Sequence, residues 1–268
     1  MNHGAPVLVF DIETIPDVAG LRRLHELPPE LSDAEVAELA FQKRRAASGN
    51  DFLPHYLQRV AVISCALRTR DAFKVFSLAE PEQAEGEIIQ RFFDGIEKYT
   101  PQLVSWNGGG FDLPVLHYRG MIHGVSAPRY WDMGEGDYGD SREFKWNNYI
   151  GRYHTRHLDL MDLLAMYQPR ANAPLDDLVR LMGCPGKLGM DGSQVWQGWL
   201  DGKVDDIRDY CETDVVNTYL AYLRFQLMRG VLGKTEHAAE VAFIRTHLAA
   251  QPQSHWRAFT AAWDNVPG

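Results

Sequence analysis

The sequence predicts an α/β fold in which helices flank a mixed central sheet. Three strand-like segments come first along the chain, helical and strand-like segments then alternate, and the C-terminal part is helical. No internal repeat, low-complexity tract or clear linker divides the chain. We therefore expect a single domain over residues 1–268, with a core at about 7–229, an insertion at about 15–57 and a helical extension at about 230–268.

The strands are predicted by short runs rich in apolar and β-branched residues, bounded by polar turns or glycines. Such runs lie at Val7–Phe10, Arg59–Leu67, Ala72–Leu78, Gln102–Trp106 and His157–Leu160. Only a short polar segment separates the second run from the third, so these two runs are expected to form a hairpin.

The helices are predicted by apolar residues that recur every three to four positions. The pattern is clearest in Glu82–Tyr99, where Ile88, Phe92 and Ile96 share one face. Further helical patterns cover about Phe111–Ile122, Leu175–Met182, Ser193–Leu200, Asp205–Met228 and Ala238–Ala249. Residues 124–154 are rich in Gly, Asp, Tyr and Trp and give no pattern that can be assigned.

Residues 15–57 interrupt the strand pattern and are therefore expected to form an insertion. They contain four prolines and one helical segment at about 32–47. Ser32 and Glu35 have capping-box spacing at the start of this helix. Its basic end consists of Lys43, Arg44 and Arg45.

Composition and charge exclude several classes of protein. The chain has 268 residues, of which 45% are apolar and 24% charged, which is typical of a packed protein. No apolar run reaches 18 residues and no signal peptide is recognisable, so we expect a cytoplasmic protein without a membrane partner. The net charge of −9 argues against a protein that coats DNA by surface charge. It is compatible with an enzyme whose carboxylates gather around bound cations.

Cysteines and histidines give no sign of a thiolate or zinc site. The three cysteines, Cys65, Cys184 and Cys211, are odd in number and form no CxxC pair, which favours a reducing compartment over a disulfide scaffold. His154 and His157 have metal-like spacing, but nothing in the sequence completes a zinc site. A partly exposed polar turn is the preferred interpretation of this pair.

The first group of candidate functional residues is Asp11-Ile12-Glu13. Residues two apart in a strand point to the same face, so both carboxylates lie together. An unpaired anion beside a buried strand is costly, and a divalent cation would offset that cost. The same spelling at Asp33-Ala34-Glu35 lies in a first helical turn, where acids simply suit the helix dipole.

The second group is Asn107-Gly108-Gly109-Gly110-Phe111-Asp112, directly after a predicted strand. Three glycines allow the backbone to bend sharply or approach a ligand closely. Asp112 falls in the first turn of the following helix, where it either binds a ligand or complements the helix dipole. No Lys-Ser/Thr pair follows the glycines, so a Walker phosphate-binding loop is not expected.

The third group is Tyr210-Cys211-Glu212-Thr213-Asp214 in the longest predicted helix. Residues four apart share a helix face, so Tyr210 and Asp214 can reach one site. A charged helix surface is the alternative, because further acids precede this group. The apolar residues that follow Asp214 indicate that its face is partly buried.

The order of these three groups resembles the motifs of the DEDD 3′–5′ exonucleases, in the subgroup that has Tyr in the third motif (DEDDy). Residues 7 to about 224 look most like stand-alone bacterial exonucleases related to the proofreading domain of family B DNA polymerases. This resemblance implies an RNase H-like fold and removal of nucleotides from a 3′ end. The insertion at 15–57 departs from the compact core of that family.

The resemblance also implies the roles of the candidate residues. It implies that two Mg²⁺ or Mn²⁺ ions, which prefer oxygen ligands, catalyse phosphodiester hydrolysis and release nucleoside 5′-monophosphates. The carboxylates that would hold them are Asp11, Glu13, Asp112 and Asp214. Tyr210 would orient the attacking water.

Substrate contacts follow from the same resemblance. Thr14 and Ile15 would contact the terminal nucleotide, while Asn107 and Phe111 would flank the strand end. Lys187 either approaches the scissile phosphate or is a solvated loop lysine. Asp159 could support the site from behind, although a structural role is the preferred interpretation.

The expected partner is the 3′ end of a single-stranded nucleic acid, with DNA favoured over RNA. An RNase D-like exoribonuclease and a catalytically silent nucleic-acid-binding domain remain alternatives. A glycosidase with paired carboxylates would leave the Tyr-x3-Asp and glycine-loop groups unexplained. No polymerase domain is expected in the remaining residues, so proofreading or DNA repair would require a separate polymerase or repair protein.

Overall fold

The computed structural model describes residues 5–79 and 83–265. The expected domain limits, Met1 and Gly268, and the expected first helical residue, Glu82, lie outside the described residues. The described part of the chain contains a five-stranded sheet with the order β3-β2-β1-β4-β5. Its strands are β1 (Val7–Pro16), β2 (Gln58–Arg68), β3 (Phe73–Leu78), β4 (Gln102–Ser105) and β5 (His157–Asp159).

The sheet is mixed, as the sequence predicts. β1 lies at its centre, antiparallel to β2 and parallel to β4, while β3 and β5 form the edges. β1 is longer than the expected run Val7–Phe10, because it stays paired with β2 as far as Pro16, past a register shift between Glu13 and Thr14. The Asp11/Glu13 pair therefore lies within the strand instead of at its end.

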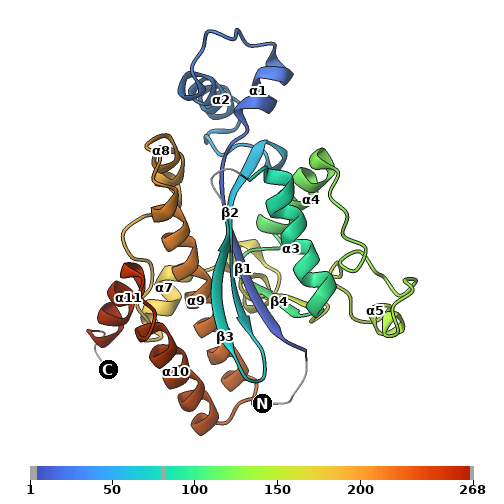
Figure 1. The fold of residues 1–268 in the computed structure, drawn as a ribbon, viewed down its shortest axis with the longest axis vertical. Coiled ribbons are helices and arrows are strands. Elements are labelled where there is room, and N and C mark those ends of the chain that lie inside the picture. The colour runs from blue at the N-terminus through green and yellow to red at the C-terminus, as the bar shows by residue number, and fades with distance from the viewer. Residues whose placement is uncertain (1–4, 80–82, 266–268) are drawn as a thin grey trace.

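Helices cover both faces of the sheet, and the shared apolar cores show which helix lies on which face (Figure 1). Leu8, Phe10 and Ile12 of β1 belong to one core, which they share with α3 (Glu85–Tyr99) and α4 (Asp112–His123). Val9 belongs to the opposite core, which contains α9 (Val204–Met228). Since side chains alternate along a strand, Asp11 and Glu13 lie on the α9 side with Val9.

The remaining helices agree with the sequence patterns to within a few residues where a pattern was present. The short helices after β5 are α6 (Leu160–Leu164), η2 (Pro169–Ala171), α7 (Leu175–Leu181), η3 (Gly192–Gln194) and α8 (Val195–Leu200). The helix expected at Ser193–Leu200 begins with the 3-10 turn η3, and the long helix expected at Asp205–Met228 is α9.

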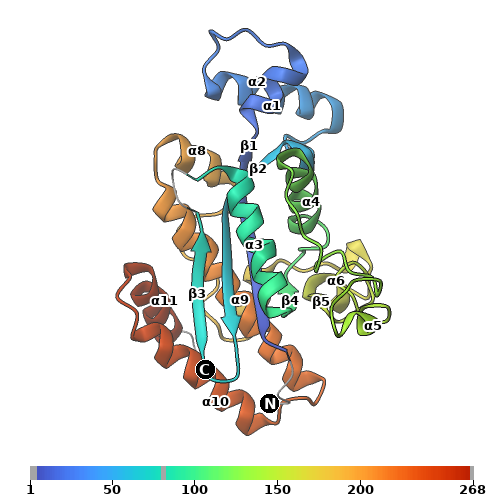
Figure 2. The same cartoon turned by 45° about the vertical axis from the view of Figure 1, so that its right-hand side comes forward.

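The insertion forms a small lobe at one end of the molecule, beyond the ends of β1 and β2 (Figures 1 and 2). It consists of α1 (Val18–His25), α2 (Asp33–Ser48) and η1 (His55–Leu57). The predicted capping box is present, because Ser32 and Glu35 bond each other's backbone amides at the start of α2. The lobe has its own apolar cluster, which includes Leu21, Val36 and Leu57.

A helical pair, α10 (Lys234–Ala249) and α11 (Ser254–Asp264), ends the described chain. α10 begins four residues before the expected Ala238, because Gly233 N donates to the Glu236 carboxylate at 2.8 Å and caps the helix. The pattern analysis did not predict α11. Among the described residues, no helix combines the length and apolar character needed to cross a bilayer.

Residues 124–154, which the sequence left unassigned, contain one short helix, α5 (Ser141–Phe144). Polar side chains fix this segment: the guanidinium of Arg129 contacts both Asp132 and Asp140. His154 Nδ1 lies 3.0 Å from Asn148 N, whereas His157 Nε2 lies 2.8 Å from Ser105 Oγ. The two imidazoles therefore have separate protein partners, which agrees with the preferred interpretation of a polar turn.

Candidate active site

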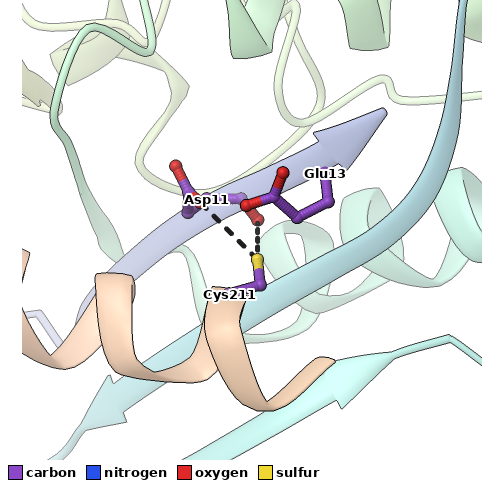
Figure 3. A group of neighbouring side chains, drawn as sticks. All are labelled: Asp11, Glu13 and Cys211. Atoms are coloured by element: carbon purple, nitrogen blue, oxygen red, sulfur yellow. Dashed lines mark hydrogen bonds between the residues drawn. The ribbon is translucent and has the colours of Figure 1, made fainter. Parts of the chain in front are cut away.

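The Asp11 and Glu13 side chains lie beside Cys211 of α9, between the central strand and that helix (Figure 3). The Cys211 thiol is 3.5 Å from Asp11 Oδ2 and 3.6 Å from the Asp11 carbonyl oxygen. Potential ligand atoms of the three residues all lie within 4.8 Å of one another. Burial raises the pKa of Cys211 well above its ordinary value, so the residue is a thiol that donates to Asp11.

Asp112 reaches the same strand from its other edge. β4 pairs with β1 only as far as Val9, which leaves the following part of that edge without a neighbouring strand. There Asp112 Oδ1 accepts a hydrogen bond of 3.1 Å from the backbone amide of Ile12, midway between Asp11 and Glu13. Burial raises the pKa of Asp112 to about 7, although the bond from Ile12 opposes the shift.

Asp214 approaches from α9 and is also buried. Its Oδ2 atom forms an ion pair of 2.8 Å with Lys187 Nζ. Its Oδ1 atom is buried and has no hydrogen-bond partner within the described part of the chain. Burial raises the pKa of Asp214. A buried carboxylate oxygen without a partner is costly to maintain and suits a position that faces a cation.

Lys187 and Tyr210 complete this side of the site. The Lys187 ammonium donates to the Tyr210 hydroxyl as well as to Asp214. Burial opposes its charged form, but the carboxylates of Asp214, Asp11 and Glu13 outweigh burial and raise the pKa of Lys187. Burial raises the pKa of Tyr210, so the phenol is neutral. Of the two interpretations of Lys187, the geometry favours a position among the carboxylates over a solvated loop.

The carboxylates also act on one another. Burial is the main cause of the raised pKa of Asp11, and repulsion from Asp112 and Asp214 adds to it. Glu13 shows the same behaviour, with burial first and then repulsion from Asp11 and Asp214. The structure therefore brings the four acids of the three sequence motifs into one electrostatically coupled group, from β1, α4 and α9. Such a group is unfavourable when all members are ionised unless cations offset the repulsion.

The glycine loop before Asp112 is held by Asp159 of β5. Asp159 accepts hydrogen bonds from the backbone amides of Asn107 at 3.0 Å and Gly109 at 2.9 Å. A side chain at Gly108 could not be accommodated, because its Cβ would lie 2.3 Å from Ser105 Oγ. Asp159 is therefore a structural residue, and the amides it binds are not free for a phosphate.

Thr14 and Ile15, both expected to contact the terminal nucleotide, are in different environments. Thr14 is half-buried and its hydroxyl donates to Gln58 Oε1 at 3.0 Å. Ile15 is only 2% exposed and packs in an apolar cluster with Val62 and Tyr210. Since the Ile15 side chain belongs to the core, a nucleotide contact from this segment would have to come from other atoms.

Two polar features of the site were missed by the sequence analysis. Cys211 was not singled out, although it lies three residues before Asp214 and so shares a helix face with it. The second feature is an ion-paired cluster in which His255 of α11 contacts Asp209 at 2.9 Å and Glu212 at 3.1 Å. No local signal could have revealed this cluster, because α11 itself was not predicted.

Comparison with known proteins identifies relatives of this arrangement. A family model described as "Predicted 3'-5' exonuclease related to the exonuclease domain of PolB" matches residues 50–263. The chain is also 25% identical over 156 residues to the catalytic protein of DNA polymerase epsilon from Saccharomyces cerevisiae, which covers 54% of this chain and only 6% of the yeast protein. The match to the family includes Asp112, Tyr210 and Asp214 and begins after Asp11 and Glu13. Together with the sheet topology, it confirms the expected RNase H-like fold.

Proposed function

The chain belongs to the predicted 3′–5′ exonucleases related to the exonuclease domain of PolB, and from that premise we propose that it removes nucleotides from the 3′ end of single-stranded DNA. Membership implies a nuclease that acts on nucleic acid. The observation that supports the site is the convergence of four carboxylates, one of which has a buried oxygen without a partner in the described part of the chain. They are Asp11, Glu13, Asp112 and Asp214.

This donor set fits divalent metal ions, which exonucleases of this kind generally use. All four side chains offer carboxylate oxygens, which are the ligands that Mg²⁺ and Mn²⁺ prefer. We propose that these carboxylates hold two such ions. Bound there, the pair would stabilise the attacking and leaving oxygens of phosphodiester hydrolysis. Cys211, a neutral thiol that donates to Asp11, would orient that carboxylate without being a ligand itself.

Tyr210 and Lys187 would position the attacking water. Because the Tyr210 hydroxyl accepts a hydrogen bond from Lys187, its own proton is available for a water or for Asp214. The phenol stays protonated near neutral pH, since burial raises its pKa. In this proposal Tyr210 aligns the water for attack on the terminal phosphodiester, and nucleoside 5′-monophosphates leave. The tyrosine supports membership of the DEDDy subgroup.

We further propose that residues 1–268 act as a single exonuclease domain of the stand-alone bacterial type, with DNA preferred to RNA. The DNA preference is supported by the printed name of the yeast relative, which is part of a DNA polymerase. A polymerase or repair protein as a partner would follow from the same relationship. An RNase D-like exoribonuclease is the alternative that the test below has to exclude.

The test is a time course on oligonucleotides of matched DNA and RNA sequence, labelled at either end, with Mg²⁺, Mn²⁺ or EDTA. We expect a ladder that shortens from the 3′ end of DNA only with metal. Asp11→Asn should abolish it, whereas Asp71→Asn, at an exposed carboxylate in the turn between β2 and β3, should not. Shortening from the 5′ end, or wild-type rates for Asp11→Asn, would contradict the proposal.

A further inference from the structure

An aromatic cluster lies directly beside the candidate active site and is partly supplied by the insertion. Phe111 immediately precedes Asp112, and its ring centroid is 5.4 Å from that of Phe52 and 5.6 Å from that of His55. Phe52 is 53% exposed, although a phenylalanine gains stability from burial. The three residues Phe52, His55 and Phe111 are called the aromatic platform below.

The platform is fixed by hydrogen bonds of its own backbone surroundings. His55 Nε2 lies 3.1 Å from the Gly110 carbonyl oxygen, which can only accept, so the imidazole donates. The Phe52 amide donates to Asn50 Oδ1 at 3.2 Å, and its carbonyl oxygen accepts from Arg44 Nε at 3.0 Å. Phe52 is therefore held at the surface by a well-connected loop.

A second connection joins this loop to the strand that carries the carboxylates. The buried Gln58 side chain donates to the Leu53 carbonyl oxygen at 3.1 Å and accepts from the Thr14 hydroxyl at 3.0 Å. Leu53 follows Phe52, and Thr14 follows Glu13. The position of the platform is thus tied to both sides of the carboxylate group, to β1 through Gln58 and to Asp112 through Phe111.

The charge next to the platform is positive, in contrast to the acidic chain as a whole. Arg45 of α2 is neutralised by Asp51 at 3.0 Å. Arg44, which contacts the Phe52 carbonyl, has no ion-pair partner in residues 5–79 and 83–265. Rings with an adjacent free cation match a nucleotide, whose base stacks and whose phosphate is anionic.

We propose that the aromatic platform binds a base near the 3′ end of a single-stranded nucleic acid by stacking, with Arg44 contacting the neighbouring phosphate. This inference rests on the proposed exonuclease function and gives the insertion a part in it. Paired bases in a duplex stack on each other and do not expose their faces to such rings. A single-stranded end is therefore the substrate class that the platform selects.

The test measures the affinity of a fluorescent single-stranded oligonucleotide by anisotropy in an Asp11→Asn background, which removes hydrolysis. We expect Phe52→Ala to raise the Kd about 5- to 20-fold, within the range measured for loss of one stacked base. Phe52→Trp keeps a ring and should stay within about twofold of the parent. Tyr99→Ala is the matched control, because Tyr99 is 43% exposed but lies at the C-terminal end of α3.

A set of oligonucleotides with one abasic site at each of the last few positions separates stacking from a general disturbance. At one position the missing base should itself weaken binding, and Phe52→Ala should then have no further effect. An unchanged Kd for Phe52→Ala, or the same loss at every abasic position, would overturn the platform. Degradation from the 3′ end with unaltered binding contradicts the platform alone, whereas ring-dependent binding without any degradation contradicts the exonuclease proposal.

Discussion

Two acidic clusters lie along the same stretch of α9, and they are built on opposite principles. In the cluster around His255, the imidazole contacts both Asp209 and Glu212, and Ser77 donates to the remaining Glu212 oxygen at 2.7 Å. In the cluster around Asp11, carboxylates repel one another and Asp214 Oδ1 has no partner among the described residues.

The difference shows how a structural acid can be told from one that waits for a cation. Burial opposes protonation of His255, but hydrogen bonds to Asp209 and Glu212 outweigh burial and raise its pKa to about 9. An imidazolium has no free lone pair, so it compensates the acids and cannot itself bind a metal. Lys187 supplies only one positive charge to the four acids of the other cluster.

The largest expected effect contrasts one acid from each cluster. Asp214→Asn should reduce exonuclease turnover by more than about a hundredfold, the loss typical of residues that merely support metal ligands. Asp209→Asn, one turn away, should stay within about tenfold of the wild type. Steady-state rates on a labelled single-stranded DNA measure both. Equal losses would mean that the two clusters do not differ in function.

Tyr210→Phe tests the group that lies between the clusters. The phenylalanine keeps the ring in place but removes the hydroxyl that Lys187 contacts. We expect turnover to fall about 10- to 100-fold while KM changes little, because an aligned water matters mainly in the transition state. A rise in KM at an unchanged turnover would instead assign Tyr210 to substrate binding.

His255→Gln should affect stability more than catalysis. Loss of a partly buried ion-pair partner is expected to lower the free energy of unfolding by roughly 1–3 kcal/mol, measured by urea denaturation. Turnover of the folded enzyme should stay within about threefold of the wild type. A hundredfold loss of turnover with unchanged stability would move this cluster into the catalytic machinery.

The smallest effect is the pH dependence of the same residue. Its pKa rises from 6.5 to about 9 on folding, so the folded state binds the proton more tightly. The stabilisation from His255 is therefore complete below about pH 6.5 and is lost as pH rises towards 9. Between these values the wild type should lose its advantage over His255→Gln in the unfolding midpoint. A constant difference across this range would contradict the ion pair.

Local periodicity predicted those parts of the fold and site that depend on near neighbours. Alternation placed Asp11 and Glu13 on one face of a strand, and helical spacing placed Tyr210 near Asp214. The carboxylate of Asp112 fell where expected because a strand and a glycine loop precede it. The fold class followed from the order of such segments.

Features that depend on distant parts of the chain could not be predicted in this way. The Lys187 contact with Asp214 and the His255 cluster join segments that no local pattern relates. Residues 124–154 are held by side-chain bonds such as that of Asn147 Oδ1 to the Thr155 amide, and not by a periodic apolar face. The strand β1 extended beyond its apolar run because pairing with β2, and not hydrophobicity, sets its end.

The central claim is that the carboxylates around Asp11 hold divalent cations whereas those around His255 do not. Titration with Mn²⁺, followed by isothermal calorimetry, tests it most directly. We expect two ions per chain for the wild type and for Asp209→Asn, and weakened or lost binding for Asp214→Asn. No binding by the wild type, or binding that Asp209→Asn removes and Asp214→Asn spares, would contradict the account.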